Sequence, residues 1–166
     1  MKSTASALAG AAMLVCASAG TAAAQAYVTQ KNISAQAGFK IAQAAIEACK
    51  KNGYEISVVV VDRDGLIRLA VRADNASPHN FDLARRKAYT ARTFRRTSAS
   101  WAKRMNDEPG LSGQKSLADV IPLGGGVPIN VGDDTIGAVG VSGSPGQDKD
   151  EACAAAGVAA IAADLK

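Results

Sequence analysis

The sequence predicts a single α+β domain, in which two β-hairpins form one antiparallel sheet that is covered by helices. The chain has 166 residues, which is the length of one domain. Two pairs of short apolar runs each flank a turn, and a hairpin makes its two strands antiparallel. Longer segments with apolar residues at helical spacing lie before, between and after these hairpins, so helices can cover the sheet.

The first helix is predicted over residues 34–51, with the first hairpin directly after it. Ser34 can cap this helix, and an Asn-Gly pair can end it. Residues 56–61 form a β-branched run that is too short for a helix, and residues 66–71 are its apolar partner. The Asp-Gly pair between the two runs is a specific hairpin signal.

The later elements repeat the order of helix and hairpin. Ser77 before Pro78 predicts the start of a helix that Ser77 caps. The predicted elements are helices over residues 78–96, 101–105 and 148–165, an exposed loop over 107–119, and strands over 127–131 and 135–141. Small residues such as Gly140 share one face of the last strand, so another element is expected to approach that face closely. Strands and helices do not alternate as in a dinucleotide-binding fold, so the glycines at 124–126 are not interpreted as a nucleotide loop.

The first 24 residues have the features of a secretory signal peptide. Lys2 gives a basic start, a short apolar run follows, and small residues spaced A-x-A end the segment. Cleavage is expected after Ala24 or Ala26, which leaves a mature domain of residues 27–166 in the periplasm or outside the cell. The apolar run is too short for a permanent membrane span.

Composition excludes some classes of partner. Only 4% of the residues are aromatic, which argues against nucleic-acid modules that stack bases on aromatic side chains. Cleavage removes Lys2 from the 19 basic residues and none of the 15 acidic ones. The mature chain is therefore only mildly basic, at about +3, and its charge alone indicates no particular partner.

Two cysteines, Cys49 and Cys153, remain in the mature chain, each on a predicted helix. Cysteines of an exported protein can pair, provided that the two helices lie close and face each other. Two small buried thiols are the commoner arrangement and the first interpretation, with a disulfide as the alternative. The spacing of cysteine and histidine matches no structural or catalytic zinc motif.

The helix predicted over residues 78–96 carries candidate contacts for an acidic ligand. Arg85 and Arg92 fall within one narrow stripe at helical spacing, and such a stripe attracts carboxylates or phosphates. A solvated outer face is the alternative interpretation. Lys87 instead projects to the apolar side of the helix. It either extends along its apolar neighbours to solvent or lies in a lined pocket, where it would pair with a ligand anion.

His79 is the single histidine of the chain and lies in the first turn of that helix. One histidine cannot build a multi-histidine metal site, but it can supply one axial ligand to haem iron; an exposed turn residue is the alternative. Glycine-rich loops offer backbone N–H groups to an anion, so Gly125, Gly126 and Ser144 are also candidate ligand-binding residues. The sequence contains no nucleophile elbow and no evident acid–base pair, so binding is favoured while enzymatic activity stays open.

Four ordered segments together resemble the GlcG/HbpS family. They are VVVVDRDG at 58–65, ARRKAYTA at 84–91, GGGVPI at 124–129 and IGAVGVSG at 136–143, and the resemblance extends over about residues 34–166. It implies a profilin-like domain of the order α-β-β-α-β-β-α that assembles into oligomers, in agreement with the order predicted above. His79 lies just before the family's central helix, where some members also have histidine, and Lys87 and Thr90 match the K-A-x-T motif of that helix. The Asp-Asn-Ala at 74–76 replaces a frequent Asp-Gly-Ala, which leaves the loop geometry before His79 open.

The resemblance implies a function in binding small molecules. Family members include exported haem-binding proteins and a haem-binding module attached to a cobalamin adenosyltransferase, and they differ in their haem ligands. We therefore expect an exported homo-oligomer that binds haem or a related tetrapyrrole, with His79 on the iron and basic residues of the same helix on the propionates. The alternative is binding, or enzymatic processing, of a small carboxylate such as a 2-hydroxy acid in a pocket between subunits.

Overall fold

The computed structural model describes residues 25–165, so the predicted signal peptide at 1–24 lies outside the described residues. In chain order, the elements are α1 (Ala35–Lys50), β1 (Ser57–Asp62), β2 (Ile67–Arg72), α2 (His79–Phe94), α3 (Ser98–Asp107), the 3-10 helix η1 (Pro109–Ser116), β3 (Gly126–Val131), β4 (Asp134–Ser142), α4 (Gln147–Ala159) and the 3-10 helix η2 (Ala162–Asp164). This order confirms the predicted α+β class. None of the helices within the described residues is long and apolar enough to cross a membrane.

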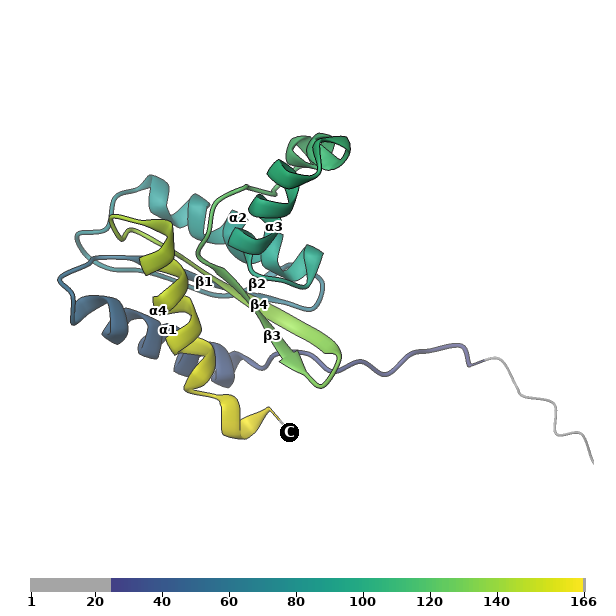
Figure 1. Cartoon of the computed structure of the whole chain (residues 1–166). Coiled ribbons are helices and arrows are strands. Elements are labelled where there is room, and N and C mark those ends of the chain that lie inside the picture. Colours follow the sequence, from purple (N-terminus) through teal and green to yellow (C-terminus); the bar gives the residue numbers. More distant parts are fainter. Residues whose placement is uncertain (1–24, 166) are drawn as a thin grey trace, which may run out of the picture.

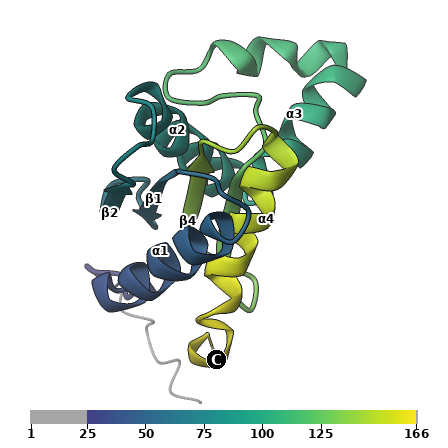
Figure 2. The same cartoon turned by 90° about the vertical axis from the view of Figure 1, so that its left-hand side faces the viewer.

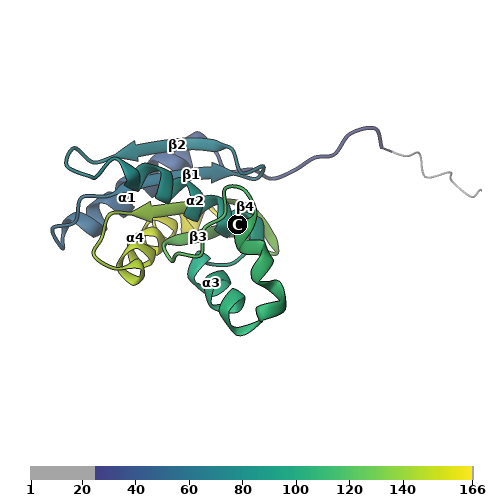
Figure 3. The same ribbon diagram turned by 90° about the horizontal axis from the view of Figure 1, so that it is seen from above.

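The two hairpins join into one antiparallel sheet with the strand order β2-β1-β4-β3 (Figure 3). The central pair is β1 and β4, in which Ser57 lies opposite Ser142 and Val59 opposite Gly140. Because side chains alternate between the two faces of a strand, β1 supplies the core on both sides. Val58 and Val60 pack in one apolar cluster, and Val59 and Val61 in another.

Helices cover both faces of the sheet. Figure 1 shows α1 and α4 below the sheet and α2 with α3 above it, and Figure 2 shows α1 and α4 lying side by side. On the α2 side, the helix backbone lies very close to β4, because a Cβ atom at Gly140 would collide with the backbone carbonyl of Ala84. This contact is the close approach that the small-residue face of the last strand predicts.

A disulfide joins α1 to α4 through Cys49 and Cys153. The first interpretation from the sequence, two free buried thiols, is therefore wrong. The reason is tertiary, because α1 and α4 pack side by side in one apolar cluster (Figure 2). Both cysteines are buried, with exposed fractions of 0% and 5%.

Local differences from the predicted elements have local causes. Helix α2 begins at His79 without a side-chain cap from Ser77, whose carbonyl instead accepts the N–H of Asn80. It ends at Phe94 because Arg95 adopts the left-handed conformation, with φ of 53°. Helix α3 is longer than predicted, since Thr97 caps it by accepting the N–H of Ser100. Residues 109–116, predicted as part of a loop, form η1.

Candidate functional site

A pocket of about 370 Å³ lies where the first turns of α2 and α4 meet the end of β4. Its lining brings together three of the residues that the sequence predicts, His79, Lys87 and Ser144. The other lining residues are Ser77, Asn80, Leu83, Leu123, Ser142, Gly143, Gly146, Gln147 and Asp150. A volume of this size is typical of small-molecule sites.

His79 lies at the rim of this pocket, as the first residue of α2. The imidazole is exposed, so an incoming group can reach it from solvent. Leu83, one turn further along α2, and Leu123, which is 38% exposed, give the pocket two apolar side chains. The rim thus combines one imidazole with apolar surface.

Lys87 lies deeper in the pocket and is only 3% exposed. Its Nζ donates to the Asp150 carboxylate at 2.7 Å and to the Val141 carbonyl at 3.1 Å. Asp150, in the first turn of α4, is equally buried at 4% exposure, and its other oxygen accepts the N–H of Ser144 at 2.9 Å. The lysine therefore meets an internal carboxylate, and a ligand entering the pocket encounters a neutral pair rather than a free cation.

Gly125 and Gly126 lie behind Lys87 and do not line the pocket. A Cβ atom on Gly125, whose φ is 118°, would lie 2.7 Å from the Val141 carbonyl and 3.1 Å from the Lys87 chain, and one on Gly126 would collide with the Lys87 backbone. The N–H of Gly126 donates to Ser98 Oγ at 2.8 Å. The two glycines thus allow the lysine to be buried, and within the described residues the N–H of Gly126 is already used by a protein side chain.

The two arginines of the predicted stripe also lie outside the pocket lining. Arg85 is held by the carboxylates of Asp82 and Asp119 at 2.9 and 2.8 Å. Partial burial lowers the pKa of Arg85. The hydrogen bonds and charges of these two carboxylates together raise it by more, so the net pKa lies above its ordinary value. Arg92 is near the opposite end of α2, where burial and the nearby charges of Arg63 and Arg95 lower its pKa.

Thr90, the other residue of the family-like motif, positions the chain that leads to the pocket. Its hydroxyl donates to the Arg86 carbonyl at 2.8 Å and accepts the N–H of Ile121 at 2.9 Å. Arg86 itself donates to the Val120 carbonyl at 2.7 Å. These bonds fix the segment just before Leu123, which lines the pocket.

Several pocket residues were missed by the sequence analysis, above all Asn80, Ser142 and Asp150. Asn80 and Lys87 are seven positions apart on α2, a spacing that places them on one helix face, so this signal was available. No local signal pairs Asp150 with Lys87, because the two residues meet only through the tertiary fold.

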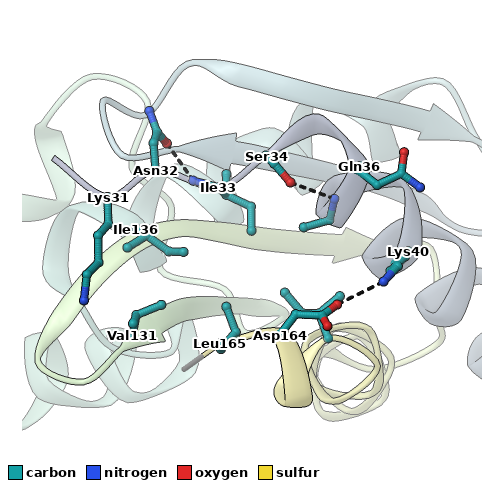
Figure 4. Close-up of a pocket in the computed structure, with 12 residues that line it drawn as sticks. Lys31, Asn32, Ile33, Ser34, Gln36, Lys40, Val131, Ile136, Asp164 and Leu165 are labelled. Atoms are coloured by element: carbon teal, nitrogen blue, oxygen red, sulfur yellow. Dashed lines mark hydrogen bonds and ion pairs between the residues drawn. The ribbon is translucent and has the colours of Figure 1, made fainter.

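A second, larger pocket of about 580 Å³ lies between the segment before α1, the start of α1 and the C-terminal residues (Figure 4). Lys40 and Asp164 form an exposed ion pair of 2.9 Å at its edge, and Ile33 and Ile136 contribute apolar lining (Figure 4). None of the residues that the sequence analysis singles out as ligand-binding lines this pocket. The His79 pocket is therefore the candidate functional site.

Within residues 25–165, no group of three or more His, Cys, Asp or Glu side chains is placed to hold a metal ion. Metal chemistry at the candidate site would therefore depend on His79 together with a group that brings its own ligands, as a macrocycle does.

Comparison with known proteins decides the family. The family model described as "Haem degrading protein HbpS-like" matches residues 33–159. The chain belongs to the HbpS-like family. The protein GlcG of Escherichia coli K12 is 35% identical over 114 residues, which are 69% of this chain and 84% of GlcG.

Solved structures share the fold of this HbpS-like protein. A double mutant of HbpS from Streptomyces reticuli has a TM-score of 0.76 at 35% identity, covering 90% of this chain and 97% of its own. The PduOC:heme complex has a TM-score of 0.72 at 26% identity, covering 79% of this chain and 96% of its own. These structures support the single-domain architecture described above.

Proposed function

We propose that this HbpS-like protein binds haem or a related tetrapyrrole in the pocket at His79. The observation that carries the proposal is the exposed imidazole at the rim of a pocket of about 370 Å³ that also presents Leu83 and Leu123. The HbpS-like family match and the structural likeness to a PduOC:heme complex support the same class of ligand.

The residues present fit a haem group. His79 would bind the iron, since one imidazole suffices when the macrocycle supplies the equatorial nitrogens. Leu83 and Leu123 would contact the apolar face of the ring. Bound haem would supply an iron centre whose reactivity depends on the axial ligand and on the polarity of the pocket.

Assembly into a homo-oligomer is part of the proposal. A pocket of about 370 Å³ that is bounded by exposed side chains encloses only part of a macrocycle. Leu123 in the pocket lining and Phe81, two positions after His79 on α2, are 38% and 37% exposed, so a second subunit could cover the remaining ring face.

Export is proposed from two independent features. Residues 1–24 have a signal-peptide pattern, and Cys49 and Cys153 form a disulfide. Disulfides persist mainly in oxidising compartments such as the periplasm and the extracellular space. We therefore propose that the mature protein lies in the periplasm or outside the cell.

Binding is favoured over catalysis by the contacts of the polar side chains in the pocket. Ser144 Oγ lies 3.4 Å from the sulfur of Cys49, which is already in a disulfide, and Lys87 is paired with Asp150. These contacts use groups that a nucleophilic mechanism would need to be free. A small carboxylate remains the second candidate ligand, because the first turns of two helices meet at the pocket.

A hemin titration of the mature, oxidised protein tests the proposal. We expect a saturable shift of the Soret band at micromolar hemin, which His79→Ala abolishes and added imidazole restores. Thr93→Ala is the matched control, because Thr93 is exposed on α2 and lies outside the pocket lining. Absence of a saturable shift in the unmodified protein would refute haem binding. Light scattering with and without hemin tests the oligomer.

A further inference from the structure

Three polar side chains with unused hydrogen-bonding capacity lie on the α2 side of the sheet, two of them in the lining of the His79 pocket and the third on the neighbouring strand. Ser57, Ser142 and Asn80 are 0%, 3% and 7% exposed. The Ser57 hydroxyl oxygen is fully buried and has no hydrogen-bond partner among the described residues. Asn80 and Ser142 both line the pocket. Buried polar groups normally have partners, so unused capacity beside a cavity points to a bound group.

The fold brings these three side chains together. Ser142 lies on the same face of β4 as Gly140, over which α2 packs, and Ser57 is its direct cross-strand neighbour. Neighbours of this kind have Cβ atoms about 4.5–5.5 Å apart, so the two side chains are adjacent, although no hydrogen bond joins them. Asn80 is adjacent, because its Nδ2 lies 3.2 Å from the position that a Cβ atom on Gly143 would occupy.

The first residues of two helices line the same pocket. Helix α2 begins at His79 and α4 at Gln147, and neither has a side-chain cap. The free N–H groups of a helix start give it a partial positive charge. Asn80 lies in the first turn of α2, so its amide adds donors where this potential favours an anion.

The charged groups around the cluster do not cancel this preference. Lys87 and Asp150 neutralise each other at 2.7 Å, and the lysine uses two of its three N–H donors in the described contacts. Asp82, in the first turn of α2, is exposed and bonded to Arg85. Asp148, in the first turn of α4, is exposed and outside the pocket lining, although its carboxylate lies beside Gly146, which is part of that lining.

We propose that Asn80 and Ser142, together with the uncapped starts of α2 and α4, form a carboxylate-binding subsite. The Asn80 amide and the Ser142 hydroxyl donate to the carboxylate, and the unpartnered Ser57 hydroxyl lies on the neighbouring strand beside Ser142. This proposal rests on the proposed function, because it assumes that a ligand occupies the His79 pocket. The carboxylate has two possible sources, a propionate of a tetrapyrrole or a free small acid.

Asn80→Asp is the decisive variant. It changes the shape of the side chain little and replaces an amide donor with a group that repels a carboxylate. An aspartate in the first turn of a helix is favourable for the fold. Asn106→Asp is the matched control, because Asn106 is exposed on α3 and bonded to Lys115, outside the pocket. Ser142→Ala is a second, neutral variant, and thermal unfolding checks that each variant folds.

The ligands are hemin, hemin dimethyl ester, in which both propionates are esterified, and sodium glycolate or lactate. If a propionate occupies the subsite, Asn80→Asp weakens hemin binding by about tenfold or more and leaves the ester unchanged. If a free acid occupies it, glycolate or lactate raises the unfolding midpoint of the unmodified protein, and Asn80→Asp removes that rise. In either case, Ser142→Ala weakens the binding of the same ligand.

The subsite would be overturned if Asn80→Asp weakened the binding of hemin and of its ester equally. It would also be overturned if neither variant changed hemin binding and neither acid changed the unfolding midpoint. Both outcomes leave the haem proposal standing. If the unmodified protein neither binds hemin nor responds to either acid, the proposed function and the subsite are both refuted. The failures of the two proposals are thus distinguishable.

Discussion

Replacement of Lys87 by methionine is expected to destabilise the fold strongly. The Lys87 and Asp150 side chains are 3% and 5% exposed and 2.7 Å apart, so the change leaves a buried carboxylate with the Ser144 N–H as its remaining described partner. Removal of one member of a buried ion pair costs about 3–5 kcal/mol. Methionine keeps most of the apolar volume of the lysine chain, so little of that cost comes from packing.

Thermal and urea unfolding of the oxidised mature protein measure this effect. For a domain of this size, the expected cost corresponds to a fall in the unfolding midpoint of roughly 10–20 °C. Lys103→Met is the matched control, because Lys103 pairs with Asp107 on α3 with both side chains exposed. Loss of an exposed pair of this kind costs about 0–1 kcal/mol.

The double variant Lys87→Met/Asp150→Asn separates charge from packing. Asparagine removes the unpaired charge and keeps a carbonyl oxygen that can accept the Ser144 N–H. The double variant should therefore be more stable than Lys87→Met alone. A cost below about 1 kcal/mol for Lys87→Met, with no recovery in the double variant, would refute the assignment of a buried, mutually neutralising pair.

Two further predictions concern the packing of the helices on the sheet. Cys153→Ser should lower the free energy of unfolding in urea by about 2–5 kcal/mol, since the disulfide joins residues 104 positions apart, and the reduced unmodified protein should match the variant. If reduction leaves the urea midpoint unchanged, the disulfide does not form. Gly140→Ala should cost about 1–3 kcal/mol or more, because its Cβ would collide with the Ala84 carbonyl, whereas Gly113→Ala, with open space around it, should cost far less. Equal stability of the two alanine variants would contradict the close packing of α2 on β4.

The architecture was predictable because its signals are local. The strands β1 and β2 follow from one apolar run on each side of an Asp-Gly turn, and hairpins fix antiparallel pairing. The small face of β4 predicted a close approach, which the packing of α2 over Gly140 confirms. The helix ends were harder to predict from the sequence, because the left-handed conformation of Arg95, which ends α2, has no strong sequence signal.

The candidate site was only partly predictable, because its parts come from distant segments. His79 could be singled out as the one histidine, and Lys87 as a basic residue on an apolar helix face. The partner of Lys87 could not be found in the same way, because Asp150 lies 63 positions away and meets it only through the strand order. The disulfide depends in the same way on the tertiary placement of α1 beside α4.

The buried pair and the disulfide together fix the geometry of the pocket. The disulfide ties α4 to α1 below the sheet, and the Lys87–Asp150 pair ties α4 to α2 above it. The starts of α2 and α4, which carry His79 and Gln147, are thereby held on the two sides of one cavity. A site held by packed helices loses little conformational freedom when a ligand enters. Selectivity should therefore depend on the fixed donors inside the pocket rather than on the closure of a loop.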